Sequence, residues 1–400
     1  GVAPVRQSWH AAGSLVSAGR LGEEREPIRL AAVVGQGAES LAEIDLRMHG
    51  PHALVGGTTG AGKSEFLQSW IMSLATGASP ERLAFLLVDY KGGAAFAECV
   101  DLPHTVGLVT DLSPHLVRRA LTSLRAELRY REELLAEHGA KDLLAMERRS
   151  DPAAPPALLI VIDEFAALAG EVPEFVDGVI DIAQRGRSLG LHLIMATQRP
   201  AGVIKDNLRA NTNLRVALRM ADEADSADVI GVKDAAFFDA ETPGRGAIKI
   251  GPGRIEHFQT GYLGARTSGE VPTSRLEVRT LGFVEGEAWA IPDETPVTFA
   301  PRRGDSPRIP RDIERLRDAI VAAAEQGGIA RPRKPWLDTL PTLIPLDELR
   351  AGDPSRENIR DASEPRTRGV LIGLRDRPDA QAQDPVEIRL DEIGNLAIVG

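Results

Sequence analysis

Apolar residues in the first two thirds of the chain form short continuous runs separated by stretches with helical spacing. The runs predict strands at 28–35, 44–48, 52–57, 82–93, 104–111, 157–165, 189–198 and 213–220, and a closing hairpin at 246–250 and 255–263. Helical spacing predicts helices at 64–77 and 113–138. Strands that alternate with helices are typical of an α/β domain with a mainly parallel central sheet.

The pattern changes after residue 265, where proline, arginine and acidic residues become more frequent and apolar periodicity weakens. We interpret 266–365 as an extended linker with one helix at 309–328. Its segment KPWLDTLPTLIPLDEL, at 334–349, contains Trp336 and spaced leucines, which is typical of a segment that docks on a neighbouring domain. Residues 1–27 are loosely patterned and are interpreted as an adaptor or linker, so the main domain is predicted at 28–265.

The end of the chain repeats an earlier segment. Residues 44–56 (IDLRMHGPHALVG) and 388–400 (IRLDEIGNLAIVG) align without a gap and share six identical positions. The similarity is either chance likeness between two strands or the start of a second nucleotide-binding domain at 366–400. The second interpretation predicts a fold with two related domains, of which only the N-terminal strands of the second are present.

Composition narrows the class of protein. The chain has 400 residues, more than one compact domain usually holds, and a formal net charge of −11. That charge argues against a general polyanion binder, although it leaves room for a local basic pore. Cys99 is the single cysteine, which excludes an internal disulfide and indicates a reducing compartment. No apolar run reaches the roughly 18–20 residues that cross a bilayer, so we expect any membrane anchor outside this chain.

Residues 57–64 read GTTGAGKS and match the phosphate-loop pattern G-x-x-x-x-G-K-[ST] in full. A strand is predicted before the loop and a helix after it, as the motif requires. Glycines let backbone amides turn toward phosphate oxygens, Lys63 reaches the β- and γ-phosphates, and Ser64 ligates Mg²⁺. The predicted nucleotide-binding residues are Gly57, Thr58, Thr59, Gly60, Ala61, Gly62, Lys63, Ser64 and Glu65.

Polar side chains end two later strands. Asp163 and Glu164 follow the apolar run ALLIVI about 100 residues after the loop, and Gln198 ends HLIMATQ. Asp163 is predicted to bind Mg²⁺ and Glu164 to polarise the attacking water. Ligands of open α/β sheets bind at the carboxyl ends of strands, so Gln198 is predicted to sense the γ-phosphate, with strand capping as the alternative.

Phosphoryl transfer is also greatly accelerated by an arginine that neutralises developing charge, often one supplied by another subunit. Nothing in the residues alone selects one arginine from the set. The candidates are Arg129, Arg131, Arg187, Arg215 and Arg219.

Seven segments together resemble the FtsK/SpoIIIE family of motor ATPases, with closest likeness to the EccC/EssC proteins of type VII secretion. They are GGTTGAGKSE, FLLVDYKGGAAF, DLPHTVGLVTDL, ELRYREELL, LIVIDEF, RGRSLGLHLIMATQRP and the run from NLRANTNLRVALRM to DVIG. They lie within 28–265. The resemblance implies RecA-like domains that act as hexamers, and the linker and repeat favour the secretion branch.

The resemblance adds roles to particular residues. Arg131 stands where the family's E-x-x-R-R segment has its second arginine, which implies a finger that acts in trans. Tyr130 replaces the first arginine and is a departure from the pattern. Asp89 and Lys91 match a family signature near the nucleotide pocket, or else form a glycine-stabilised turn at a strand end. Trp336 resembles a linker anchor, with ordinary linker packing as the alternative.

The resemblance implies an ATPase module that couples Mg·ATP hydrolysis to the export of small helical proteins. The expected partners are neighbouring ATPase domains or subunits, membrane proteins of a secretion complex, and the exported proteins. The expected location is the cytoplasmic side of the cell membrane, with anchoring through segments outside this chain. The alternatives are a DNA translocase of the same family and a regulatory domain that binds ATP without turnover; the adjacent Asp163 and Glu164 disfavour the latter.

Overall fold

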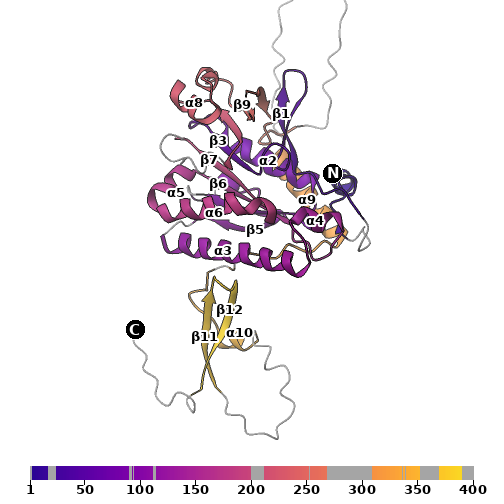
Figure 1. Ribbon diagram of the computed structural model, residues 1–400, viewed down its shortest axis with the longest axis vertical. Helices are drawn as coiled ribbons and strands as arrows, with labels where there is room; N and C mark the ends of the chain where they lie inside the picture. Colours follow the sequence, from indigo (N-terminus) through magenta and orange to yellow (C-terminus); the bar gives the residue numbers. More distant parts are fainter. Residues whose placement is uncertain are drawn as a thin grey trace, which may run out of the picture.

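The computed structural model describes residues 2–16, 24–89, 92, 94–110, 114–199, 211–251, 253–267, 309–335, 337, 339–351 and 369–389. Its central feature is a ten-stranded sheet in the order β2-β1-β10-β9-β8-β3-β7-β6-β4-β5 (Figure 1). The strands are β1 Ala31–Gly37, β2 Leu41–Asp45, β3 His52–Gly56, β4 Leu83–Asp89, β5 Thr105–Val109, β6 Ala157–Asp163, β7 Leu191–Thr197, β8 Leu214–Leu218, β9 Arg245–Ile250 and β10 Ile255–Thr260.

The strands from β8 to β5 in this order pair in parallel, which confirms the predicted mainly parallel α/β fold. The predicted closing hairpin is β9–β10, and antiparallel pairing continues from it through β1 to β2. Four strands at the centre (β3, β4, β6 and β7) are buried along their whole length. Burial on both faces explains why these strands appear in the sequence as continuous apolar runs rather than as alternating patterns.

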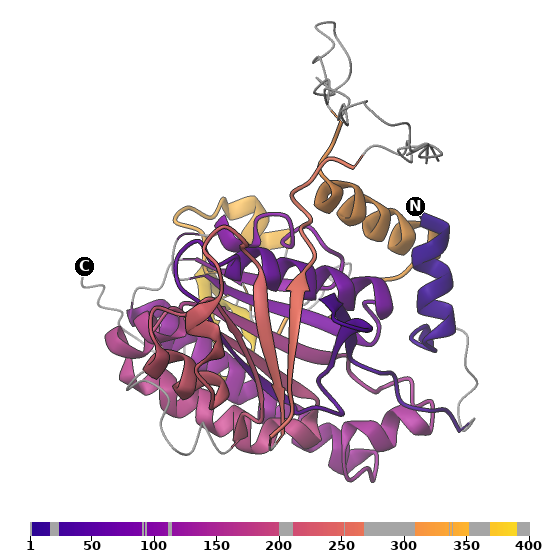
Figure 2. The ribbon, with the colours of Figure 1, turned by 90° about the horizontal axis from the view of Figure 1, so that it is seen from above.

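Helices cover both faces of the sheet (Figures 1 and 2). On one face α2 packs against β1 and against α1 and α9, and on the other α3 packs on α6, which contacts β7. The helices are α1 Val2–Ala11, α2 Lys63–Gly77, α3 Pro114–Glu137, α4 Leu143–Arg148, α5 Phe165–Glu171, α6 Pro173–Leu189, α8 Glu223–Ile230, α9 Asp312–Gly327 and α10 Leu346–Ala351.

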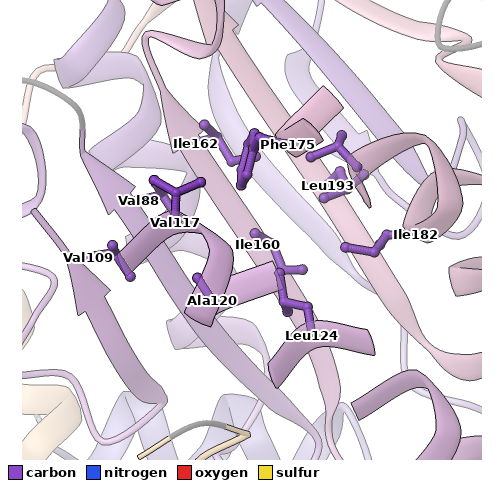
Figure 3. A pocket seen from close by; sticks show the side chains of 11 residues that line it. Val88, Val109, Val117, Ala120, Leu124, Ile160, Ile162, Phe175, Ile182 and Leu193 are labelled. Carbon is purple, nitrogen blue, oxygen red and sulfur yellow. The ribbon is translucent and has the colours of Figure 1, made fainter. Parts of the chain in front are cut away.

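Apolar side chains fill the space between α3, α6 and strands β4 to β7 (Figure 3). The cavity left among them measures about 10 Å³, which is room for about one water molecule. Its lining is entirely apolar, and Ile160, Phe175 and Leu193 are nearly fully buried there. A dry gap of this size is a packing defect of the core rather than a ligand site.

The loosely patterned N-terminus contains the helix α1, which the sequence did not predict. Trp9 anchors α1, because its side chain is fully buried and its Nε1 donates a hydrogen bond to the Ala75 carbonyl at 2.9 Å. The Trp9 ring also meets the buried His104 edge to face, with ring centroids 5.9 Å apart. This helix contacts α9, so two segments that flank the predicted main domain in the sequence, one before it and one after it, lie side by side (Figure 2).

The helix predicted at 309–328 is present as α9. Beyond it, β11 (Val370–Arg377) and β12 (Ala382–Ile388) form an antiparallel hairpin beside α3 (Figure 1). Arg119 of α3 donates to both carboxylate oxygens of Asp376, at 2.6 and 3.0 Å. The predicted domain limits stay predictions. Trp336 and residues 390–400, which hold most of the second copy of the repeat, lie outside the described residues.

Arg333 connects the segment before this hairpin to α3. Its guanidinium lies 4.1 Å from the centroid of the Tyr130 ring and pairs with Glu127, which is nearly fully buried. It also donates to the side chain of Gln381, between the two hairpin strands, at 2.8 Å. The buried carboxylate of Glu127 is bonded to both Arg333 and Gln381, so α3, this segment and the hairpin form one contact region. Among the described helices, none is long and apolar enough to cross a membrane.

Candidate active site

Three parallel strands bring the predicted site residues to one edge of the sheet. β3 ends at Gly56, which lies beside Thr197 at the end of β7, and β6 ends at Asp163 beside Asp89 of β4. The glycine loop, the two acids and Gln198 all follow these strand ends directly. The expectation that they share the carboxyl edge of the sheet is met for the described residues.

The loop between β3 and α2 takes a shape that its glycines permit. Gly60 and Gly62 have φ angles of 76° and 88°, in the left-handed region that other residues adopt with strain. A Cβ atom on Gly62 would also lie 2.8 Å from the backbone nitrogen of Gly244. The loop is held from the other side as well, because the Thr58 amide and hydroxyl both donate to the Arg219 carbonyl.

Helix α2 begins directly at the loop and presents unpaired amides there. Phe66 is the first residue of the helix whose amide bonds back, to the Gly62 carbonyl at 2.9 Å. The amides of residues 63–65 therefore have no carbonyl of a preceding turn to bond, and the helix dipole adds positive potential. Ser64 is half-buried and Glu65 exposed at this position. Such a helix start, following a glycine loop, is suited to bind phosphate oxygens.

Lys63 lies between the two predicted acids. Its Nζ is 2.5 Å from Asp163 Oδ1 and 3.4 Å from Glu164 Oε2. All three side chains are nearly buried, with 6, 4 and 7 % of the surface of Lys63, Asp163 and Glu164 exposed. Residues that are 100 positions apart in the chain thus form one compact charged cluster. Their catalytic roles remain predictions.

Glu164 has an unusual backbone conformation. Its φ and ψ angles are 58° and 46°, a left-handed conformation that is strained for a residue with a side chain. The backbone amide of Glu164 donates to Asp163 Oδ1 at 3.0 Å, and Glu164 Oε1 accepts from the backbone amide of Gln198 at 3.3 Å. These bonds fix both acids relative to the end of β7 and direct the Glu164 carboxylate toward the Lys63 ammonium.

Gln198 connects the acids to the loop. Its side-chain Oε1 accepts a hydrogen bond from the Thr59 hydroxyl at 3.1 Å, while its backbone amide bonds to Glu164. Gln198 therefore contacts both the glycine loop and the predicted base, which is the position that a sensor of the terminal phosphate requires.

A cavity of about 600 Å³ opens beside the loop. Its lining includes predicted residues, among them Thr59, Lys63, Ser64 and Gln198. It also includes five residues that the sequence did not indicate, all from the β9–β10 hairpin and its flanks. They are Pro243, Gly244, Gln259, Thr260 and Tyr262. The volume is within the range of small-molecule and cofactor sites.

Residues 21–202 match the family model of the FtsK/SpoIIIE family. The chain carries a domain of the FtsK/SpoIIIE family. The match includes the glycine loop, both acids and Gln198.

The chain is also similar to individual members of type VII secretion systems. It is 35% identical over 376 residues to the secretion system protein EssC of Staphylococcus aureus, which covers 91% of this chain and 25% of EssC. The chain thus spans about a quarter of the length of this curated relative. The solved cytoplasmic domain of the Thermomonospora curvata type VII secretion ATPase EccC is 29% identical, with a TM-score of 0.70 over 92% of this chain and 39% of the solved chain.

A third similarity is to the pCW3 conjugation coupling protein TcpA, whose structure was determined with ATPγS. It is 27% identical, with a TM-score of 0.50 over 60% of this chain and 68% of TcpA. Together the family and these relatives indicate a nucleotide-hydrolysing enzyme with the P-loop ATPase fold.

The donor set of the FtsK/SpoIIIE domain fits a magnesium ion. Mg²⁺ in nucleotide sites prefers oxygen ligands and is held by one or two protein groups together with phosphates and water. Ser64 offers a hydroxyl at the start of α2, and Asp163 offers a carboxylate at the end of β6, with the Lys63 ammonium 2.5 Å from it. The ammonium of Lys63 and a magnesium ion would therefore compete for the same carboxylate.

Arg131 does not have the exposure that a finger acting in trans needs. Only 3% of its surface is exposed, and its guanidinium donates to Glu127 at 2.7 Å and to the carbonyls of Leu189 and Pro156 at 2.9 Å. All of its nitrogens are thus engaged inside the domain, so we do not retain Arg131 as a finger. It ties α3 to the start of β6 and the end of α6.

The other candidate arginines differ in their surroundings. Arg129 donates to the Asp379 carbonyl of the β11–β12 turn, Arg215 to the Thr212 carbonyl, and Arg219 to the Thr59 carbonyl of the glycine loop. Arg187 is exposed in the last turn of α6. Burial lowers the pKa of His52, the first residue of β3, to about 4, and the positive charge of Arg187 makes a smaller contribution in the same direction.

The family signature at Asp89 is only partly described. Asp89 is fully buried, and its carboxylate accepts a hydrogen bond from the Ala95 amide at 3.0 Å. Lys91 lies outside the described residues, so both interpretations of this segment stay open. Cys99 is buried, and burial raises its pKa to about 12.

Proposed function

We propose that this chain is an ATP-hydrolysing module of a type VII-like protein secretion system, coupling Mg·ATP hydrolysis to the export of small helical proteins. The observation that carries the proposal is the cluster of Lys63, Asp163 and Glu164 at the mouth of a complete phosphate loop. The similarity to EssC over 91% of this chain supports the secretion branch.

The loop binds the triphosphate. The amides of residues 63–65, which lack a carbonyl partner at the start of α2, would bind phosphate oxygens, and the Lys63 ammonium would turn from Asp163 toward them. Ser64 and Asp163 would hold Mg²⁺, which would neutralise charge on the phosphates. Because Lys63 is nearly buried, its charge acts with little screening by water.

Glu164 activates the attacking water. Its Oε2 faces Lys63 and its Oε1 accepts a hydrogen bond from the backbone amide of Gln198, so the carboxylate has one fixed orientation. When phosphate oxygens attract Lys63 away, the carboxylate is left to accept a proton from water. Gln198 contacts the loop through Thr59, which gives it a direct way to report the presence of the terminal phosphate to Glu164.

Arg187 is the arginine finger in this proposal, and it neutralises the charge that develops at the active site of a neighbouring subunit. It is exposed and lies three residues before Gly190, at the end of the sheet where β7 begins. The acids and the loop follow the opposite ends of the strands, so Arg187 cannot reach the site of its own domain. An arginine in that position can serve only the site of an adjacent domain. Such an arrangement requires the domains to assemble into a ring. The resemblance to the family suggests that the ring is a hexamer.

The remaining partners follow from the secretion branch. We place the module on the cytoplasmic side of the cell membrane, held there by segments outside this chain, with membrane proteins of a secretion complex as neighbours. The exported proteins are small and helical. The chain covers 25% of EssC, so these partners belong to a longer assembly than the one described.

The second candidate is a DNA translocase, because FtsK/SpoIIIE motifs are common to both branches and TcpA is a conjugation coupling protein. We expect duplex DNA at low salt to change the ATP hydrolysis rate of this chain by less than about two-fold, since the net charge of −11 opposes phosphate contacts. The measurement is steady-state ATPase activity with and without random-sequence duplex, at 50 and 200 mM salt. Stimulation of several-fold that disappears at the higher salt would replace the secretion proposal with DNA translocation.

A further inference from the structure

The lining of the cavity beside the phosphate loop comes from two chemically different parts of the chain, the glycine loop with Gln198 and the β9–β10 hairpin with its flanks, which we call the phosphate end and the hairpin end. One end carries Lys63 and Gln198, which belong to the triphosphate machinery. The other end is formed by the β9–β10 hairpin and carries neutral groups: an aromatic ring, an amide, a hydroxyl and a proline. Neutral, partly apolar surfaces of this kind suit a base and sugar rather than phosphates.

The hairpin is fixed to the loop through backbone contacts. The Gly244 amide donates to the Ala61 carbonyl at 2.9 Å, and the Gly244 carbonyl accepts from the Thr260 amide at 2.9 Å. A Cβ on Gly244 would lie 2.4 Å from the Thr260 side chain, so only glycine allows this close approach. The spacing between the phosphate end and the hairpin end is therefore set by the backbone and cannot easily change.

Tyr262 presents an open aromatic face at the hairpin end. Its side chain follows β10, lines the cavity and is 64% exposed, which is high for a large ring. A Cβ on Gly264 would lie 2.5 Å from the ring Cζ, so the glycine makes room for the ring to lie against its own turn. An exposed ring held by its local backbone is a surface on which a nucleobase can stack.

Gln259 offers the polar edge that a base needs. Its Nε2 donates to the Pro243 carbonyl at 2.8 Å. A carbonyl can only accept, so the amide orientation is fixed, and Oε1 remains an acceptor beside the second N–H donor. An adjacent donor and acceptor match the amine and ring nitrogen of adenine, which is how Gln recognises adenine elsewhere.

We propose that Tyr262, Gln259 and Pro243 form the nucleoside subsite of this domain, with the adenine base stacked on Tyr262 and read by Gln259. This inference rests on the proposed ATP binding at the phosphate loop and extends it. The loop and Lys63 bind the phosphates of any nucleotide, whereas the hairpin selects the base. The two parts of the affinity are therefore separable by experiment.

The test compares Mg·ATP with magnesium tripolyphosphate, which has the phosphates without a nucleoside, by calorimetric titration. Tyr262→Ala is expected to weaken Mg·ATP binding about 10-fold, the size of a lost base-stacking contact, and to leave tripolyphosphate binding unchanged. Tyr262→Phe keeps the ring and retains the parent affinity. Phe237→Ala removes another exposed ring, 71% exposed and outside the cavity lining, and is the matched control with parent affinity for both ligands.

Unchanged Mg·ATP affinity in Tyr262→Ala would overturn the subsite, and so would an equal loss for tripolyphosphate. Gln259→Leu adds a second readout, in which the ratio of ATP to GTP affinity falls toward one; a ratio equal to that of the parent contradicts the reading role. A parent protein that binds neither ligand contradicts the proposed ATP site itself, so the two failures are distinguishable.

Discussion

Glu164→Gln is expected to lower the rate of ATP hydrolysis by at least about 100-fold, the usual contribution of a general base, while Mg·ATP affinity stays within about three-fold of the parent. The side-chain amide introduced by the substitution has nearly the shape of the carboxylate. Its oxygen can still accept the hydrogen bond from the backbone N–H of Gln198, so the loop and Asp163 keep their places. What it loses is the ability to take a proton from water. The measurement is steady-state phosphate release together with a binding titration of the same preparations.

Glu133→Gln is the matched control, because Glu133 is an exposed carboxylate on α3, away from the cavity lining. It should hydrolyse ATP at the parent rate. Hydrolysis by Glu164→Gln at the parent rate would remove Glu164 from the mechanism. Loss of Mg·ATP binding by the same variant would instead assign Glu164 to holding the nucleotide.

Arg187→Ala is expected to lower the rate of hydrolysis about 1,000-fold, as loss of an arginine finger does, without changing Mg·ATP affinity. Because the proposed finger serves a neighbour, an equimolar mixture of Arg187→Ala and Glu164→Gln should regain activity that neither variant has alone. In the mixture, some interfaces combine the Glu164 of one subunit with the Arg187 of the next. The measurement is ATPase activity of the mixture at concentrations where the parent activity rises with concentration.

Arg185→Ala is the control for the same helix, since Arg185 is exposed two residues earlier and pairs with Asp181 and Glu132. It should keep the parent rate. If the Arg187→Ala protein is as active as the parent, Arg187 is not the arginine finger. A mixture that stays inactive while the parent assembles would refute its action in trans.

The phosphate end of the site could be predicted from sequence because each of its parts is local. The glycine loop is a contiguous motif. The adjacent Asp163 and Glu164 follow a continuous apolar run, and Gln198 follows a largely apolar one, so both runs are predicted as buried strands. Parallel strands place their carboxyl ends together whatever their order. The cluster around Lys63 therefore required no knowledge of which strand pairs with which.

The hairpin end and the buried arginine could not be predicted in this way. Gln259 and Tyr262 reach the loop because β9 and β10 extend the sheet beside β8, and strand order depends on long-range pairing that no short motif encodes. Glu127 and Arg131 have the i, i+4 spacing of an ordinary solvated pair. Their burial depends on the carbonyls of Leu189 and Pro156, which come from distant parts of the chain.

The central claim is that the loop and the two acids form one triphosphate site, and Lys63 is the residue that belongs to both. The most direct measurement is calorimetric titration of Mg·ATP into the parent and into Lys63→Ala, with Lys141→Ala, an exposed lysine outside the cavity lining, as the control. The account predicts about 100-fold weaker binding for Lys63→Ala, from the loss of charge-assisted bonds to phosphate, and parent affinity for Lys141→Ala. Equal affinity in all three proteins would contradict it.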